Sequence, residues 1–244
     1  MSGRDLDRDP TSIRRDGGSD STSIRRHWPL FDLVVRTPRI ELRYVDDDLA
    51  ARLVDRAASG VHDPAIMPFR IPWTDAEPPE LQRASLRYYW GNRARLSPDD
   101  WVLDLAVLVD GEVVGAAGLQ AERFATLRSV ETGSWLGRAH QGRGLGTGVR
   151  RANLHLAFAG LGAAVAESGA MVDNPASQAV SRKLGYVENG RRPILQRDRP
   201  GELVWFRLDR AAWEARLPGR GADAAETHTS LSGAPTSRTT STDS

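Results

Sequence analysis

The stretch HQGRGLGTG (140–148) is the first candidate for chemistry, because glycine occupies every second position from 142 onward. Leu145, Val149 and Ala152 follow at the spacing of one helix face. The glycines therefore lie at the start of a predicted helix, where unpaired amides and the helix dipole favour an anion. Glycines also let a phosphate oxygen approach the backbone. The stretch predicts a backbone cradle for phosphate groups.

Two common phosphate motifs do not fit this stretch. A P-loop would place Lys-Ser or Lys-Thr after its last glycine, but the only lysine of the chain is Lys183. The dinucleotide fingerprint needs glycines at i, i+2 and i+5, and the third position here is Thr147 or Val149, depending on the starting glycine. The pattern that remains is Gln-x-x-Gly-x-Gly, beginning at Gln141.

Composition excludes several other classes of function. The chain of 244 residues has no cysteine, which excludes disulfides, cysteine-ligated zinc and a cysteine nucleophile; no metal site is predicted. Its formal net charge is +1, so the arginines are balanced by acids and no nucleic-acid surface is predicted. There is no apolar run long enough for a membrane span or a signal peptide. We therefore expect a cytoplasmic protein.

The two ends of the chain differ in composition from the middle. Residues 1–27 and 218–244 are rich in small and polar residues and contain too few apolar side chains to offset the entropy of ordering. We predict disordered tails over these ranges and one folded domain over 28–217. TSIRR occurs at 11–15 and again at 22–26. We interpret it as low-complexity sequence, with a short docking element as the alternative.

Within 28–217, strand and helix periodicities alternate. RIELRYV (39–45) has an apolar residue at every second position, which predicts a strand. Asp46 can cap the following helix, which Gly60 ends. Prolines then predict a loop over 61–79. The later predicted elements are a helix over 80–95, strands over 101–109 and 112–119 joined by Asp110-Gly111, a strand over 129–136, a helix over 144–159, a strand over 163–172, a helix over 175–184 and a hairpin over 194–208 turning at Pro200-Gly201. This order predicts a mixed α/β fold, with one sheet and helices on its faces.

Three segments of this sequence resemble the GNAT acetyltransferase superfamily. The Gln-x-x-Gly-x-Gly pattern is similar to that family's acyl-CoA pyrophosphate loop. ETGSWLGRAHQGRGLGT (131–147) and DNPASQAVSRKLGYVENG (173–190) resemble the strand before the loop and the later helix in the RimJ/RimL-like branch, and LVVRTPRIELRYVDDDLA (33–50) resembles that branch's first strand and helix. The resemblance spans about 34–208. It implies a GNAT-type acyl-CoA N-acyltransferase fold with a central, mostly antiparallel sheet.

The resemblance also implies an acyl-CoA site. Arg143 would add charge beside the diphosphate; the alternative is an ordinary solvated arginine. Gly133 would let the strands separate around the pantetheine arm; the alternative is a packing role. Asn174 would contact the pantetheine or the acceptor, with a helix N-cap as the alternative. Ser181 stands where many members carry a tyrosine that protonates the leaving thiolate, and Tyr186 is expected in the core. The predicted cofactor-binding residues are Ser134, Trp135, Leu136, Gln141, Gly142, Arg143, Gly144, Leu145, Gly146, Thr147, Asn174 and Ser181.

The general base is less well defined. Glu131 lies on the strand before the loop, where some relatives place a glutamate, although strand alternation equally allows it to face solvent. His62 and Glu202 are the alternatives. Glu131, Ser181 and Asn174 form the predicted catalytic set. Residues of the proline-rich loop are predicted to line the acceptor pocket, with a loop packed on the core as the alternative. These residues are Arg70, Trp73 and Thr74.

The resemblance implies direct transfer of an acyl group from acyl-CoA to a primary amine of a protein or small molecule. Acetyl is the expected group, and succinyl is the alternative, because Arg70 could pair with its terminal carboxylate. A CoA-binding or CoA-sensing module without transfer activity is the second hypothesis, since the usual tyrosine is absent. The expected partners are acyl-CoA and an amine acceptor, and the resemblance favours a homodimer.

Overall fold

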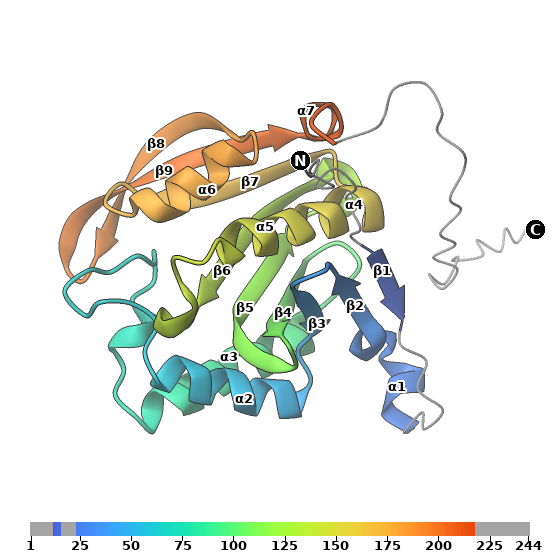
Figure 1. Ribbon diagram of the computed structural model, residues 1–244, viewed down its shortest axis with the longest axis horizontal. Coiled ribbons are helices and arrows are strands. Elements are labelled where there is room, and N and C mark those ends of the chain that lie inside the picture. Colours follow the sequence, from blue (N-terminus) through green and yellow to red (C-terminus); the bar gives the residue numbers. More distant parts are fainter. Residues whose placement is uncertain (1–11, 16–22, 218–244) are drawn as a thin grey trace, which may run out of the picture.

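The computed structural model describes residues 12–15 and 23–217, and its nine strands form one sheet in the order β1-β2-β3-β4-β5-β6-β7-β9-β8 (Figure 1). The strands are β1 (Ser12–Arg15), β2 (Leu33–Arg36), β3 (Glu41–Tyr44), β4 (Trp101–Val109), β5 (Glu112–Ala121), β6 (Ser129–Leu136), β7 (Val165–Met171), β8 (Val187–Gln196) and β9 (Arg199–Asp209). Adjacent strands are antiparallel except β6 and β7. The predicted mixed, mostly antiparallel sheet is confirmed.

Helices cover both faces of the sheet. They are α1 (Ser23–His27), α2 (Asp47–Ala58), α3 (Glu80–Arg95), α4 (Phe124–Leu127), α5 (Leu145–His155), α6 (Pro175–Lys183) and α7 (Arg210–Glu214). Figure 1 shows α5 in front of β5 and β6, with α2 and α3 running together in the lower part of the view. The described residues contain no helix long and apolar enough to cross a membrane.

Alternation along the central strands builds a core on each side of the sheet. On one face, Ala106 and Ala116 pack with apolar side chains of α2 and with Tyr89 of α3. On the other face, Leu105 and Leu119 pack with apolar side chains of α5. Because successive strand residues point to opposite faces, α2 and α3 are separated from α5 by the sheet. The α5 side and the α2–α3 side of the sheet are therefore two distinct surfaces.

The start of α2 illustrates how local sequence fixes an element. The side chain of Asp46 accepts a hydrogen bond from the backbone N–H of Leu49 at 2.9 Å, which satisfies one of the unpaired amides of the first turn. Gly60 follows the helix with φ of +105°, a conformation that glycine adopts without strain. The predicted cap and stop of this helix therefore agree with the structure.

The closing hairpin differs from its prediction. The strands β8 and β9 are joined by Arg197 and Asp198, which have φ of 47° and 60°, while Pro200 and Gly201 lie inside β9. Positive φ at both central positions is the signature of a type I′ hairpin turn. Arg197 tolerates this because its guanidinium pairs with Asp75 of the proline-rich loop, a tertiary contact that the local sequence does not reveal.

The predicted tails are only partly described. Residues 12–15 form β1, which pairs antiparallel with β2, and residues 23–27 form α1, whereas the sequence predicted disorder throughout 1–27. Backbone pairing with β2 gives this segment partners that its own composition lacks. Residues 1–11, 16–22 and 218–244 lie outside the described residues.

Candidate acyl-transfer site

The two parallel strands separate soon after they pair. Only Ser129, Val130 and Glu131 of β6 are in register with β7, opposite residues 165–167. Beyond Glu131, β6 continues to pair with β5 as far as Leu136, while β7 pairs with β9. Within the described part of the chain, the edge of β6 that faces β7 therefore has no strand partner over 132–136. We call this region the seam.

A buried polar cluster lies at the point where β6 and β7 separate. Thr132 Oγ1 donates to the carbonyl of Glu167 at 3.0 Å and lies 2.9 Å from the hydroxyl of Tyr186. Arg150 of α5 donates to Thr132 Oγ1 at 3.3 Å and to Ser168 Oγ at 2.7 Å. Burial raises the pKa of Tyr186, and the adjacent Arg150 opposes this rise. Tyr186 lies in the core as expected, and its hydroxyl helps to fix the point where the strands part.

The glycine loop lies at the N-terminus of α5, on the α5 side of the sheet. Gly142 and Gly144 have φ of 73° and 75°, which explains why glycine is needed at these two positions. Gly144 is the N-cap and provides no side-chain hydrogen bond, so the amides of the first turn remain available for an anion. Arg143 is exposed.

Gln141 has a structural role within this loop. Its Nε2 donates to the carbonyls of Val61 and Leu136, at 2.7 and 2.8 Å. The side chain thereby ties the loop to the end of β6 and to the start of the segment after α2. Of the predicted loop residues, Leu145 packs in the core, whereas Arg143 is exposed and Thr147 is partly exposed.

Asn174 and Ser181 occupy different environments on α6. Asn174 Oδ1 accepts from the backbone N–H of Ser177 at 3.1 Å, and its Nδ2 donates to the carbonyl of Pro68 at 3.4 Å. It is therefore the helix N-cap and also holds the proline-rich loop. Ser181 is 0% exposed, and its hydroxyl has no hydrogen-bond partner among the described residues. An unsatisfied buried hydroxyl is costly, so a polar atom that reached Ser181 would gain a hydrogen bond.

A cavity of about 520 Å³ lies on the opposite, α3 side of the sheet. It is bounded by the proline-rich loop, α3 and strands β4, β5 and β6, and its lining includes Arg70, Trp73, Glu131, Ser134 and Trp135. The ring centroids of Trp73 and Trp135 are 5.7 Å apart. The structure thus brings together five residues that the sequence analysis had selected from two separate segments.

Leu136 and Thr74 are placed elsewhere. Leu136 is buried against the α5-side core, and its carbonyl accepts from Gln141. Thr74 does not line the cavity; its hydroxyl is 2.6 Å from Nε2 of His62. The side chain of Thr74 turns toward His62 and away from this cavity.

Glu131 is the only one of the three candidate bases that lines the cavity. The Nε2 of Gln120 donates to its Oε2 at 2.7 Å. His62 Nδ1 donates to the carbonyl of Asp63 at 2.8 Å, and its Nε2 lies 2.6 Å from the hydroxyl of Thr74, so both ring nitrogens are engaged. Glu202 pairs with Arg191 at 3.1 Å on the distal hairpin. The geometry favours Glu131.

Asp104 of β4 is a cavity residue that the sequence analysis missed. Its Oδ2 accepts from Nδ2 of Asn92 at 2.9 Å. Burial raises the pKa of Asp104 to about 6, although the Asn92 hydrogen bond and the charge of Arg93 oppose the rise. The only signal in the sequence was an acid interrupting an otherwise apolar strand, WVLDLAVLV.

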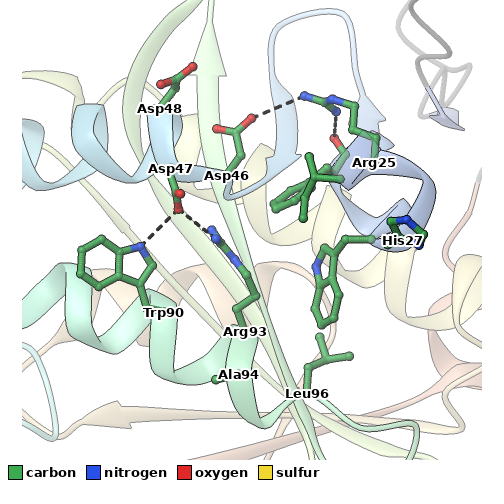
Figure 2. A pocket seen from close by; sticks show the side chains of 12 residues that line it. Arg25, His27, Asp46, Asp47, Asp48, Trp90, Arg93, Ala94 and Leu96 are labelled. Atoms are coloured by element: carbon green, nitrogen blue, oxygen red, sulfur yellow. Dashed lines mark hydrogen bonds and ion pairs between the residues drawn. The ribbon is translucent and has the colours of Figure 1, made fainter. Parts of the chain in front are cut away.

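A second hollow, of about 740 Å³, lies between α1, the start of α2 and the end of α3 (Figure 2). Asp47 accepts from Trp90 at 3.2 Å and pairs with Arg93 at 2.9 Å, and Arg25 lies 3.7 Å from Asp46. Its charged groups thus largely satisfy one another. None of the predicted site residues lines it, so we assign the chemistry to the seam and the 520 Å³ cavity.

Within 12–15 and 23–217, no group of three or more His, Asp or Glu side chains is arranged to hold a metal ion. The polar groups of the candidate site include the backbone amides at the start of α5, the Ser181 hydroxyl and the carboxyl groups of Asp104 and Glu131.

Comparison with known proteins identifies the class. A family model for an acetyltransferase (GNAT) domain matches residues 39–187. One similar structure is RimL, the ribosomal L7/L12 alpha-N-protein acetyltransferase, in complex with coenzyme A: it is 18% identical, with a TM-score of 0.57 over 71% of this chain and 95% of that one. A GCN5-related N-acetyltransferase from Brucella melitensis is 20% identical, with a TM-score of 0.57 over 75% of this chain and 80% of that one.

The fold and the family match together define an N-acetyltransferase domain. The chain belongs to the GNAT acetyltransferase family, and its fold agrees with the resemblance to the RimL-type branch seen in the sequence. Members of this family use acetyl-CoA.

Proposed function

We propose that this protein transfers an acyl group directly from acyl-CoA to a primary amine, within a complex that holds both substrates. The observation that carries the proposal is the two-sided seam: the glycine loop opens on the α5 side of the sheet, the cavity opens on the α3 side, and both meet the unpaired edge of β6. Such an arrangement holds a thioester and an amine in contact, which lowers the entropic part of the barrier.

The proposed roles follow from the environment of each group. The amides of 142–147 hold the diphosphate, and the free edge of β6 at Ser134–Leu136 receives the pantetheine and the carbonyl oxygen. Glu131 accepts a proton from the acceptor ammonium. The neutral nitrogen attacks the carbonyl carbon, the C–N bond forms and the C–S bond breaks. A second proton leaves the nitrogen and one reaches the sulfur, so that the products are the amide and free CoA thiol. The Ser181 hydroxyl, which has no partner in the fold, hydrogen-bonds the departing sulfur.

Acetyl is the proposed acyl group. Succinyl is the alternative, because Arg70 lines the cavity and forms no ion pair with any residue of the described chain. A terminal carboxylate could therefore pair with its guanidinium. If turnover with succinyl-CoA does not exceed that with acetyl-CoA, the succinyl alternative fails.

The proposal is tested by calorimetric titration with acetyl-CoA and succinyl-CoA, followed by free-thiol release with a panel of primary amines in the same samples. We expect binding of acetyl-CoA and amine-dependent thiol release. Absence of binding would show that the glycine loop has been misinterpreted.

A CoA-sensing module without transfer activity is the competing function, favoured by the serine at position 181. Ser181→Ala separates the two. In an enzyme, this variant should bind acetyl-CoA as the wild type does but release thiol more slowly. A sensor has no amine-dependent rate in either form.

A further inference from the structure

The floor of the cavity carries a carboxyl group opposite two glycines. Strand register places Asp104 of β4 opposite Gly118 of β5, and Gly118 opposite Gly133 of β6. A Cβ atom at Gly133 would meet nothing within 4 Å, and one at Gly118 would meet only the carbonyl of Leu103, at 3.7 Å. Packing does not require glycine at either position. The two glycines leave an open path from Asp104 to the edge of β6.

Asp104 has an unused oxygen in this cavity. Its Oδ2 accepts from Asn92, whereas Oδ1 has no hydrogen-bond partner and the carboxyl group has no ion pair among the described residues. Acids elsewhere in the described chain commonly pair with arginine, as Glu112 does with Arg56. A half-buried carboxylate that lacks an ion pair is unfavourable, and the nearby Arg93 is itself paired with Asp47. The carboxyl group of Asp104 is therefore able to pair with a cationic ligand.

The remaining lining also suits a cation. Glu131, the second acid of the cavity, is hydrogen-bonded to Gln120 but has no ion pair. Aromatic side chains supply negatively polarised ring faces that attract ammonium groups. They are Phe69, Trp73, Tyr88, Tyr89 and Trp135. Arg70, the only basic residue in the lining, is exposed.

We propose, on the basis of the proposed function, that the amine acceptor carries a second cationic nitrogen and that Asp104 binds it. The reactive amine then extends over Gly118 and Gly133 toward the free edge of β6 and Glu131. Two strand spacings, about 10 Å, separate β4 from β6. Asp104 is thus a specificity-determining residue that selects diamines and related dications over monoamines of the same length.

The test is calorimetric titration of the CoA-saturated protein with diaminohexane and, separately, hexylamine. CoA without an acyl group fills the seam but allows no turnover. We expect the wild type to bind diaminohexane at least about tenfold more tightly than hexylamine, the difference that one charge-assisted contact contributes. Asp104→Asn keeps the shape and can still accept the Asn92 hydrogen bond, and it should reduce this preference to less than about threefold.

Two further variants make the result specific. Asp198→Asn removes an acid of the same type at the exposed hairpin turn, where asparagine tolerates positive φ, and should retain the wild-type preference. Gly133→Val projects a side chain into the open part of the cavity and should weaken binding of both amines.

Equal affinity of the wild type for the two amines, absence of amine binding, or a preference that persists in Asp104→Asn would each overturn the proposal. Thiol release from acetyl-CoA, measured with both amines in parallel, reports the proposed function separately. Release without a diamine preference would refute the role of Asp104 alone. Diamine binding without release would refute the proposed transfer reaction.

Discussion

Replacing Asp104 by asparagine is expected to stabilise the protein at neutral and alkaline pH. Burial raises the pKa of this carboxyl group from an ordinary value of 3.8 to about 6 in the folded chain. At about 1.4 kcal/mol per pKa unit, the ionised group costs on the order of 3 kcal/mol of folding free energy. Asparagine keeps the shape of the side chain without the charge, so Asp104→Asn should recover up to about this amount.

The sign of the pH dependence is opposite to that of an acid held in an ion pair. Because the folded pKa is raised, folding favours the protonated form, and the cost is fully present above pH 6. It decreases as the pH falls through the window between about 6 and 3.8 and disappears when both states are protonated. The charged and titratable groups near this carboxyl, among the described residues, are Tyr44 of β3, Tyr88, Tyr89 and Arg93 of α3, Glu131 of β6 and Arg70 of the loop.

The assay is urea unfolding of both proteins between pH 4 and pH 8, with Asp198→Asn as the control. We expect the stability difference between Asp104→Asn and the wild type to be largest at pH 8 and to shrink toward zero near pH 4. A wild type that is more stable than Asp104→Asn at pH 8 would contradict the interpretation of Asp104 as a buried carboxylate without a cation.

Three further substitutions test other parts of the account. Gly144→Ala places a side chain at a φ of 75° and should lower the free energy of unfolding by about 1 kcal/mol. It should also weaken acetyl-CoA binding in calorimetry, and an unchanged affinity would argue against the loop as the diphosphate site. Thr132→Val removes the hydroxyl that hydrogen-bonds Glu167 and Tyr186 and should lower the free energy of unfolding by about 1–3 kcal/mol. If chemical denaturation detects no loss, these hydrogen bonds do not hold β6 and β7 together where the two strands separate. Gly115→Ala would bring a Cβ atom to 2.2 Å from the carbonyl of Trp135 and should destabilise by about 3 kcal/mol or more, whereas wild-type stability would show that β5 and β6 are not packed this closely.

The elements that the sequence predicted well are those fixed by local pattern. The helix over 80–95 and the strands over 101–109 and 129–136 have the predicted bounds, because apolar periodicity and turn residues specify them within a few residues. The predicted helix over 144–159 is α5 followed by a π-helical turn at 156–160. Backbone hydrogen-bond register is not visible in a hydrophobic pattern, so this change could not be predicted.

The candidate site was predicted only in part, because its two sides depend on different kinds of information. The glycine loop is a continuous motif and could be found directly. The cavity depends on register: Asp104 and Gly133 lie on one path only because β4, β5 and β6 pair at Gly118. The contact of the Thr74 hydroxyl with His62 across a loop could not be predicted for a related reason. Strand register and side-chain contacts between distant segments are set by tertiary packing, which the local sequence does not show.

The central claim, direct transfer across the seam, is tested most directly by initial-rate kinetics with acetyl-CoA and diaminohexane varied together. We expect double-reciprocal lines that intersect, and an intact-protein mass that is unchanged after incubation with acetyl-CoA alone. Parallel lines together with an acetyl group on the protein in the absence of amine would show a covalent enzyme intermediate and would contradict the account.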